Sequence, residues 1–158
     1  MKLWRIATET REYNADDLTG AGAAKTPGRW NDKDDHVIYT APSIAIAVLE
    51  TATYVDAAGL PLNRYLVEIT IPRPAWKQRE VINVSSLPAT WDAVPAGRGS
   101  VRFGSDWLSS KRSPILVVPS VIIPEENATL INPKHPLAEG ISARVVRRFD
   151  YNKLFRSK

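Results

Sequence analysis

One carboxylate lies within a long stretch of this 158-residue sequence that is otherwise apolar or weakly polar. Glu50 is the only charged residue between His36 and Asp56. A side chain in such a stretch is expected to be at least partly buried, and burying a carboxylate costs several kcal/mol unless it is paired or hydrogen-bonded. The guanidinium of Arg29, upstream, is an available partner. A fixed carboxylate can also act on a ligand, by stabilising positive charge that develops during a reaction.

Three further side chains join Glu50 as candidates for a site. Arg29, in the motif Gly28–Asn31 (Gly-Arg-Trp-Asn), has the planar fork of donors that suits a phosphate or a carboxylate; the alternative is an ordinary surface arginine. Tyr39 can stack on a planar ligand, although a strand tyrosine more commonly belongs to the core. Ser120 stands in a very apolar segment, so its hydroxyl needs a partner, either a ligand or a nearby carbonyl. No G-x-S-x-G surrounds it, which argues against a hydrolase nucleophile.

The composition excludes several kinds of site. The chain has no cysteine, which rules out disulfides, thiolate metal sites and a cysteine nucleophile and favours a cytoplasmic location. Its two histidines, His36 and His135, lack metal-ligand spacing, so no metal is expected. The net charge is +4, but the basic residues are not interleaved with stacking aromatics, which disfavours direct nucleic-acid binding. No signal peptide or membrane span is recognisable, so neither export nor membrane insertion is expected.

The elements that must position these side chains follow from the hydrophobic pattern. Strands are expected where β-branched and aromatic residues alternate or cluster between turn residues. The predicted strands are Leu3–Ile6, Val37–Thr40, Arg64–Ile71, Glu80–Asn83, Ile115–Val118, Val121–Ile123, Ala128–Ile131 and Ser142–Phe149.

A helix is predicted to carry Glu50. It covers Ser43–Val55, because Pro42 suits a helix start and Gly59 with Pro61 suits its end. The helical period places Glu50 beside the apolar face, on the flank shared with Ser43, Ile46 and Tyr54. That apolar face consists of Ile44, Ala47, Val48, Thr51, Ala52 and Val55.

A second helix is predicted over Val101–Ser110, with Phe103, Trp107 and Leu108 turned inward. Tyr13–Leu18 is expected to form one helical turn, and Pro88–Arg98 a loop. Strands outnumber helices, and several connections between strands are too short for crossover helices. The pattern therefore predicts an α+β fold, in a single domain over residues 1–158, with a mixed or antiparallel β core and flanking helices.

The order of these motifs resembles the RES domain family, which is named for an Arg, a Glu and a Ser. The resemblance runs from about residue 3 to about residue 149. The matching blocks are Leu3–Ile6, Gly28–Asn31, Val37–Ala41, Leu49–Glu50, Val118–Ser120, and Asn132–Pro133 with His135.

This resemblance implies a fold like that of the diphtheria-toxin type of ADP-ribosyltransferase. It also implies the toxin of a bacterial type II toxin–antitoxin pair, with NAD⁺ as substrate rather than as a prosthetic group. The implied partner is an Xre-like antitoxin that blocks the active site. The resemblance implies contact with DNA only through that antitoxin. A homodimer is compatible with the family. Residues at the implied catalytic positions are Arg29, Tyr39, Glu50 and Ser120, and those at the implied NAD⁺-binding positions are Arg5, Arg29, Trp30, Asn31 and Tyr39.

The chemistry of the residues agrees with this implication. Cleavage of the nicotinamide–ribose bond passes through an oxocarbenium-like state, and a fixed Glu50 carboxylate would stabilise its charge. The leading hypothesis is NAD⁺ breakdown by hydrolysis or phosphorolysis, which arrests growth. The second is ADP-ribosyl transfer to a protein target. The third is a binding module without catalysis, associated with nucleic acid. Whether Arg29 pairs with Glu50 or with NAD⁺ is left open.

Overall fold

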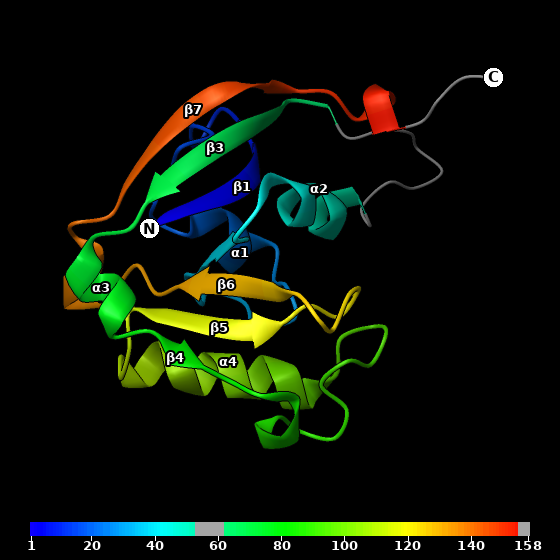
Figure 1. The fold of residues 1–158 in the computed structure, drawn as a ribbon, viewed down its shortest axis with the longest axis vertical. Coiled ribbons are helices and arrows are strands. Elements are labelled where there is room, and N and C mark those ends of the chain that lie inside the picture. Colours follow the sequence, from blue (N-terminus) through cyan, green and yellow to red (C-terminus); the bar gives the residue numbers. More distant parts are fainter. Residues whose placement is uncertain (53–61, 155–158) are drawn as a thin grey trace.

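The computed structural model describes residues 1–52 and 62–154, which form two β-sheets with helices packed against them (Figure 1). The first sheet is antiparallel, with strand order β1-β3-β7. The second has the order β2-β6-β5-β4 and is antiparallel except for the pair β4–β5. The strands are β1 (Lys2–Thr8), β2 (Ile38–Thr40), β3 (Arg64–Thr70), β4 (Glu80–Val81), β5 (Ile115–Pro119), β6 (Asn127–Ile131) and β7 (Ser142–Phe149). The α+β fold class is thereby confirmed.

The helices differ in length and in the surface that they cover. Helix α4 packs on one face of the second sheet, and α2 packs against β1 (Figure 1). None of the helices in the described ranges is long and apolar enough to cross a membrane. The helices are α1 (Ala21–Lys25), α2 (Ile44–Ala52), α3 (Arg73–Lys77) and α4 (Arg98–Ser110), with 3₁₀ turns at Val84–Ser86, Pro136–Ala138 and Tyr151–Leu154.

The principal core lies between the two sheets. It joins Leu3 and Ile69 of the first sheet to Ile115 and Ile131 of the second, and all four side chains are fully buried. These strands pack inward because alternate residues of a strand point to opposite faces. A second apolar cluster lies between α4 and the opposite face of the second sheet, and a third lies under α2.

Among the described residues, one isolated β-bridge connects the backbones of the two sheets. Trp4 of β1 and Ala41, which follows β2, exchange two backbone hydrogen bonds of 2.8 Å. The chain then turns from β2 into α2. This bridge holds Ala41, three residues before α2, beside β1.

Two predicted elements are wrong. Tyr13–Leu18 is not helical, and the helix in this part of the chain is α1, at Ala21–Lys25. Val121–Ile123 is a turn rather than a strand, because the backbone N–H groups of Ile122 and Ile123 bond to the Ser120 hydroxyl instead of to a neighbouring strand. The apolar, β-branched residues at 121–123 are typical of a strand, but here they do not form one.

Helix α3 was not predicted from the sequence, and the buried face of α2 differs from the predicted one. Pro74 lies in the first turn of α3, where its missing N–H is tolerated, so it begins a helix as well as ending the preceding strand. On α2, Ile46 is buried whereas Ile44 is 37% exposed, so the apolar face is rotated from the predicted one. The predicted continuation of α2 to Val55, with its end at Gly59 and Pro61, lies outside the described residues.

Candidate functional site

Helix α2 presents Glu50 at the border between core and solvent. The helix begins at Ile44, and the Ser43 side chain caps it by accepting a hydrogen bond of 3.2 Å from the N–H of Ile46. Ile46 and Ala47 are buried under the helix. Glu50 follows one turn later and is half-buried, as the apolar stretch predicts. The carboxylate is therefore held on a rigid element with one side toward the protein interior.

Ser120 forms a hydrogen bond with Glu50. The serine hydroxyl donates to Glu50 Oε1 at 2.5 Å, and its own side chain is almost fully buried. The same oxygen accepts hydrogen bonds from the N–H groups of Ile122, at 3.1 Å, and Ile123, at 3.2 Å. Ser120 follows β5, so a turn at the end of this strand reaches the end of α2.

The bonding pattern assigns a role to Ser120. A hydroxyl has one proton and two lone pairs. The two backbone N–H groups occupy the lone pairs, so the proton lies in the bond to Glu50. An oxygen–oxygen distance of 2.5 Å is typical of a charge-assisted hydrogen bond to a carboxylate. Ser120 therefore orients the Glu50 carboxylate.

The motif Gly28–Asn31 folds around the Asn31 side chain. Asn31 is fully buried, and its amide nitrogen donates to three backbone carbonyls. Its Oδ1 accepts from the N–H of Gly28, at 2.9 Å, and from the hydroxyl of Tyr39, at 2.8 Å. The Tyr39 hydroxyl also accepts from the N–H of Trp30, at 3.0 Å. Asn31 and Tyr39 together fix the loop that carries Arg29.

The other residues of this motif are explained by close packing. A Cβ at Gly28 would lie 2.7 Å from the Tyr39 hydroxyl, so only glycine fits there. Trp30 is buried and stacks on Trp91, with 6.4 Å between ring centroids. Trp30 and Asn31 therefore support the loop from inside.

Arg29 points to a different part of the chain from Glu50. Its Nη1 donates to the carbonyl oxygens of Trp91, at 2.8 Å, and Ala93, at 2.7 Å. No ion pair joins Arg29 to Glu50, both of which the structure describes. Arg29 instead holds the 88–97 loop through neutral carbonyl groups, and its charge has no carboxylate partner among the described residues. Its pairing with NAD⁺ stays a prediction.

Arg5 forms a third contact, on β1. Its Nη1 donates to the carbonyl oxygen of Asp17 at 3.1 Å. Burial lowers the pKa of the Arg5 guanidinium from its ordinary value, and the charges of Asp17 and Tyr13 oppose this shift. An arginine stays protonated despite such a shift, so Arg5 keeps a positive charge in a poorly solvated position.

The Asn132–His135 block is structural. Asn132 is buried and donates to the carbonyl oxygen of Leu108, at 2.9 Å, which ties the turn after β6 to α4. His135 accepts from the N–H of Leu137 at 3.1 Å and so caps the 3₁₀ turn. This bond requires an unprotonated Nδ1.

The candidate residues contact several different parts of the described structure. Glu50 contacts Ser120; Tyr39 contacts Trp30 and Asn31; Arg29 and Arg5 each contact backbone carbonyls. Strand β2 connects the Tyr39 set to α2, and the strand order β2-β6-β5 brings the end of β5 to the same side. The sequence did not indicate the carbonyl groups of Trp91 and Ala93 as partners of Arg29, since backbone groups carry no residue signal.

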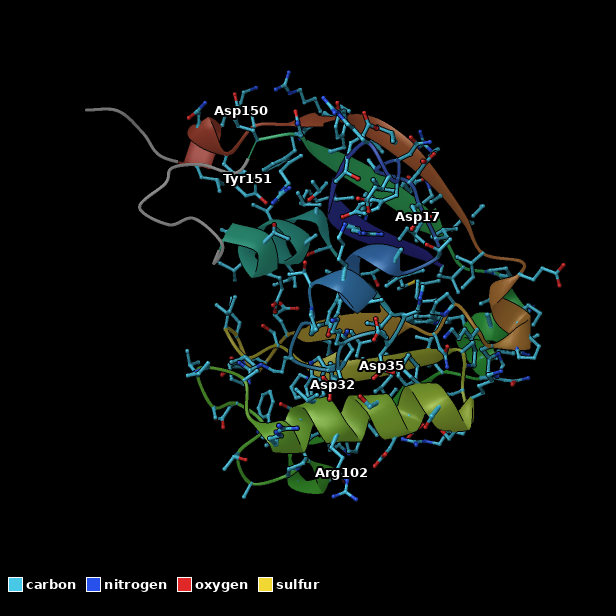
Figure 2. All side chains as sticks on the ribbon, turned by 180° about the vertical axis from the view of Figure 1, so that it is seen from behind. Asp17, Asp32, Asp35, Arg102, Asp150 and Tyr151 are labelled. Carbon is cyan, nitrogen blue, oxygen red and sulfur yellow. The ribbon has the colours of Figure 1, made fainter. Side chains whose placement is uncertain are left out.

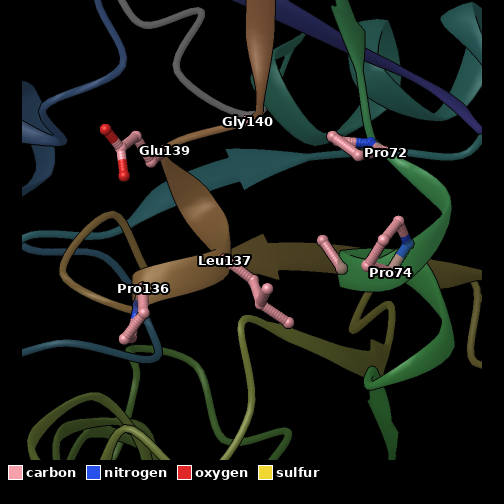
Figure 3. Close-up of a pocket in the computed structure, with 7 residues that line it drawn as sticks. Pro72, Pro74, Pro136, Leu137, Glu139 and Gly140 are labelled. Atoms are coloured by element: carbon pink, nitrogen blue, oxygen red, sulfur yellow. The ribbon is translucent and has the colours of Figure 1, made fainter.

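A hollow in the surface lies away from these residues. It is formed between α3 and the 3₁₀ turn Pro136–Ala138 (Figure 3). In Figure 1, α3 and α2 lie at opposite ends of β5. The hollow is largely apolar, and none of the candidate residues lines it. Its lining is Pro72, Pro74, Ala75, Pro136, Leu137, Glu139 and Gly140.

Comparison with known proteins identifies the family. A family model described as RES domain matches residues 2–152. The chain belongs to the RES domain family. One relative, from a Sphingobium species, is named Prs ADP-ribosylating toxin; it is 54% identical over 150 residues, which are 95% of this chain and 93% of the relative.

Two further RES relatives are named Toxin Res. The protein from Yersinia enterocolitica is 35% identical over 135 residues, covering 85% of this chain and 86% of the relative. That from Pseudomonas putida is 30% identical over 150 residues, covering 92% and 93%. The named relatives of this RES domain are thus toxins, in agreement with the resemblance drawn from the sequence motifs.

Proposed function

We propose that this RES domain is a toxin that cleaves the nicotinamide–ribose bond of NAD⁺ and transfers the ADP-ribose to a protein acceptor. The observation that carries this proposal is the 54% identity to the Prs ADP-ribosylating toxin, which extends over 95% of the chain. Prs, the protein in that relative's name, is the first acceptor to test. A fold like that of the ADP-ribosyltransferases is part of the same proposal.

Glu50 supplies the electrostatic part of the reaction. When the bond from ribose C1′ to nicotinamide breaks, the electron pair leaves with nicotinamide and positive charge develops on the ribose. A carboxylate fixed beforehand stabilises that charge without reorganising. The Ser120 hydroxyl, at 2.5 Å from Glu50 Oε1, supplies this fixed orientation. The acceptor nucleophile bonds to C1′ and releases its proton to Glu50 or to solvent.

The two arginines are proposed to hold the pyrophosphate of NAD⁺. Arg29 uses one nitrogen for the 88–97 loop, and the rest of its planar fork suits a phosphate. Arg5 keeps its charge in a half-buried position, where water screens its attraction for an anion less. Tyr39 is proposed to contribute its ring face to the nicotinamide, because its hydroxyl is engaged by Asn31 and Trp30.

The partner remains the one that the family implies. An Xre-like antitoxin encoded beside this gene is expected to block the NAD⁺ site. Co-expression of the adjacent gene should relieve growth arrest, and arrest that persists in the presence of the expressed neighbour would contradict this assignment.

Product analysis tests the enzymatic proposal. The purified protein is incubated with NAD⁺ labelled in the ADP-ribose part, with and without Prs and with and without phosphate. Label retained on Prs supports transfer. Free ADP-ribose, or its phosphorylated counterpart, would instead identify water or phosphate as the acceptor, as the leading hypothesis from the sequence expects. Absence of nicotinamide release under all conditions contradicts each of these activities.

Glu50→Gln is the decisive variant. Gln keeps the volume of the side chain and an oxygen that can accept from Ser120, so the fold should be retained. We expect nicotinamide release to fall about 100-fold or more, because the charge that stabilises the transition state is removed. Circular dichroism and thermal unfolding check the fold of the variant. Near-normal release by a folded Glu50→Gln protein would remove Glu50 from the mechanism.

A further inference from the structure

The Ser120 hydroxyl anchors the carboxylate of Glu50. An anchor at the carboxylate does not by itself fix the helix backbone from which the side chain extends. Displacements of about 1 Å in a catalytic group can lower a rate about 100-fold. A second contact that fixes the end of α2 would therefore matter for the reaction proposed above.

Tyr151 makes such a contact. It lies in the 3₁₀ turn Tyr151–Leu154, directly after β7, and Figure 2 shows it between the end of that strand and α2. Its hydroxyl donates to Thr51 Oγ1 at 2.6 Å. Thr51 is the neighbour of Glu50 in the chain. The bond joins residues 100 positions apart, so it ties the C-terminal part of the described chain to the helix that carries the carboxylate.

The hydrogen bond continues into the helix. The Thr51 hydroxyl lies 2.9 Å from the carbonyl oxygen of Ala47 and 3.0 Å from that of Val48, and it donates its proton to this pair. Both residues are buried in the cluster under α2. The hydrogen bonds from Tyr151 to Thr51 and from Thr51 to the helix carbonyl groups thus form a continuous series, in which each bond polarises the next. It holds the turn of α2 that contains Glu50.

The Tyr151 ring is itself held rigidly. Only 1% of its surface is exposed, and Phe149 packs edge-on against it with 4.9 Å between ring centroids. Burial raises the pKa of the Tyr151 hydroxyl, although Thr51 and Arg64 oppose the shift. The hydroxyl therefore remains a proton donor throughout the neutral pH range. A rigid, permanently protonated donor can fix the position of its acceptor.

We propose that Tyr151 is a positioning residue, which acts through Thr51 to hold the turn of α2 that carries Glu50 in its reactive geometry. This inference rests on the proposed function, because it assigns Glu50 to the reaction. It adds a residue that none of the sequence motifs contains. Tyr151 contacts the helix rather than the substrate, so its effect should fall on turnover and leave substrate binding unchanged.

The test compares Tyr151→Phe with Tyr65→Phe in the nicotinamide-release assay. Both variants remove one hydroxyl, but Tyr65 lies on β3 and packs in the core between the sheets, away from α2. We expect Tyr151→Phe to lower kcat about 10-fold with an unchanged KM, because the carboxylate is displaced while the binding groups are not. Tyr65→Phe should leave both constants unchanged.

Thr51 variants complete the test. Thr51→Val removes the acceptor and should reproduce the loss in kcat. Thr51→Ser keeps the hydroxyl and should have the kcat of the wild type. In the double variant Tyr151→Phe with Thr51→Val, kcat should fall no further than in either single variant. An unchanged kcat in Tyr151→Phe, or a loss that is additive with that of Thr51→Val, overturns the inference. A wild-type protein that releases no nicotinamide would instead overturn the proposed function, so the two failures are distinguishable.

Discussion

Replacing Ser120 with alanine removes three hydrogen bonds at once, and the structure allows the consequence to be worked out. The bond to a carboxylate contributes about 1.5–3 kcal/mol and each bond from a backbone N–H about 0.5–1.5 kcal/mol. Because Ile122 is 38% exposed, water can replace part of what is lost, and we expect a net loss of about 2–3 kcal/mol in the free energy of unfolding. For a chain of this length, Tm should fall by about 4–12 °C.

The functional effect of Ser120→Ala should exceed what instability explains. At a temperature at which the variant is folded, kcat for nicotinamide release should fall about 10-fold to 100-fold, because Glu50 loses its orientation but keeps its charge. Ser113→Ala is the matched control: Ser113 is also buried, and it accepts from the Trp107 indole at 2.8 Å, away from Glu50. That variant should lose stability and keep its kcat. A folded Ser120→Ala protein with wild-type kcat would refute the claim that Ser120 orients Glu50.

Two further predictions concern the scaffold. Gly28→Ala should destabilise the protein by about 1–3 kcal/mol in urea unfolding, because the added Cβ would lie 2.7 Å from the Tyr39 hydroxyl. Gly22→Ala is the control: the nearest atom to its added Cβ would be at 3.5 Å, so this variant should be tolerated. Equal stability of the two variants would contradict this explanation. The pKa of Glu68 is lowered chiefly by its hydrogen bond from Arg144, with a second bond from a lysine of β1. The stabilisation is therefore present above the ordinary value of 4.5 and is lost as pH falls through the lower folded-state pKa. Wild type and Glu68→Gln should accordingly differ in Tm at pH 7 and converge in acid, and a difference independent of pH would contradict the assignment.

The strands were predictable where the pattern is local. Arg64–Thr70 alternates in residue type, and both this segment and Ser142–Phe149 form strands over nearly the predicted ranges. The error at Val121–Ile123 has a physical cause, because a side-chain hydroxyl captures the two backbone N–H groups that a strand would need. The strand propensity of residues 121–123 does not include this bond, because its acceptor is the side chain of the preceding residue, Ser120.

The candidate site was predictable to a different degree. The apolar surroundings of Glu50 indicated partial burial and a need for a partner, and both are found. The nature of the partner was not predictable from those surroundings: a serine 70 positions away provides the contact, whereas Arg29, the cation that the sequence suggested, binds the carbonyls of Trp91 and Ala93. Every residue has a backbone carbonyl group, so residue types do not indicate which carbonyl groups a side chain binds. The role of Arg29 in the 88–97 loop therefore required the structure.

These long-range contacts have a consequence for how the site is assembled. Glu50 is held by Ser120 at the end of β5, and its helix is held by Tyr151 after β7, so both sheets must be complete before the carboxylate is fixed. The two sheets are joined beside α2 by the backbone pair of Trp4 and Ala41. A partly folded chain would lack this geometry even if α2 had formed. The reactivity proposed for Glu50 therefore depends on the completed fold rather than on the helix that carries it.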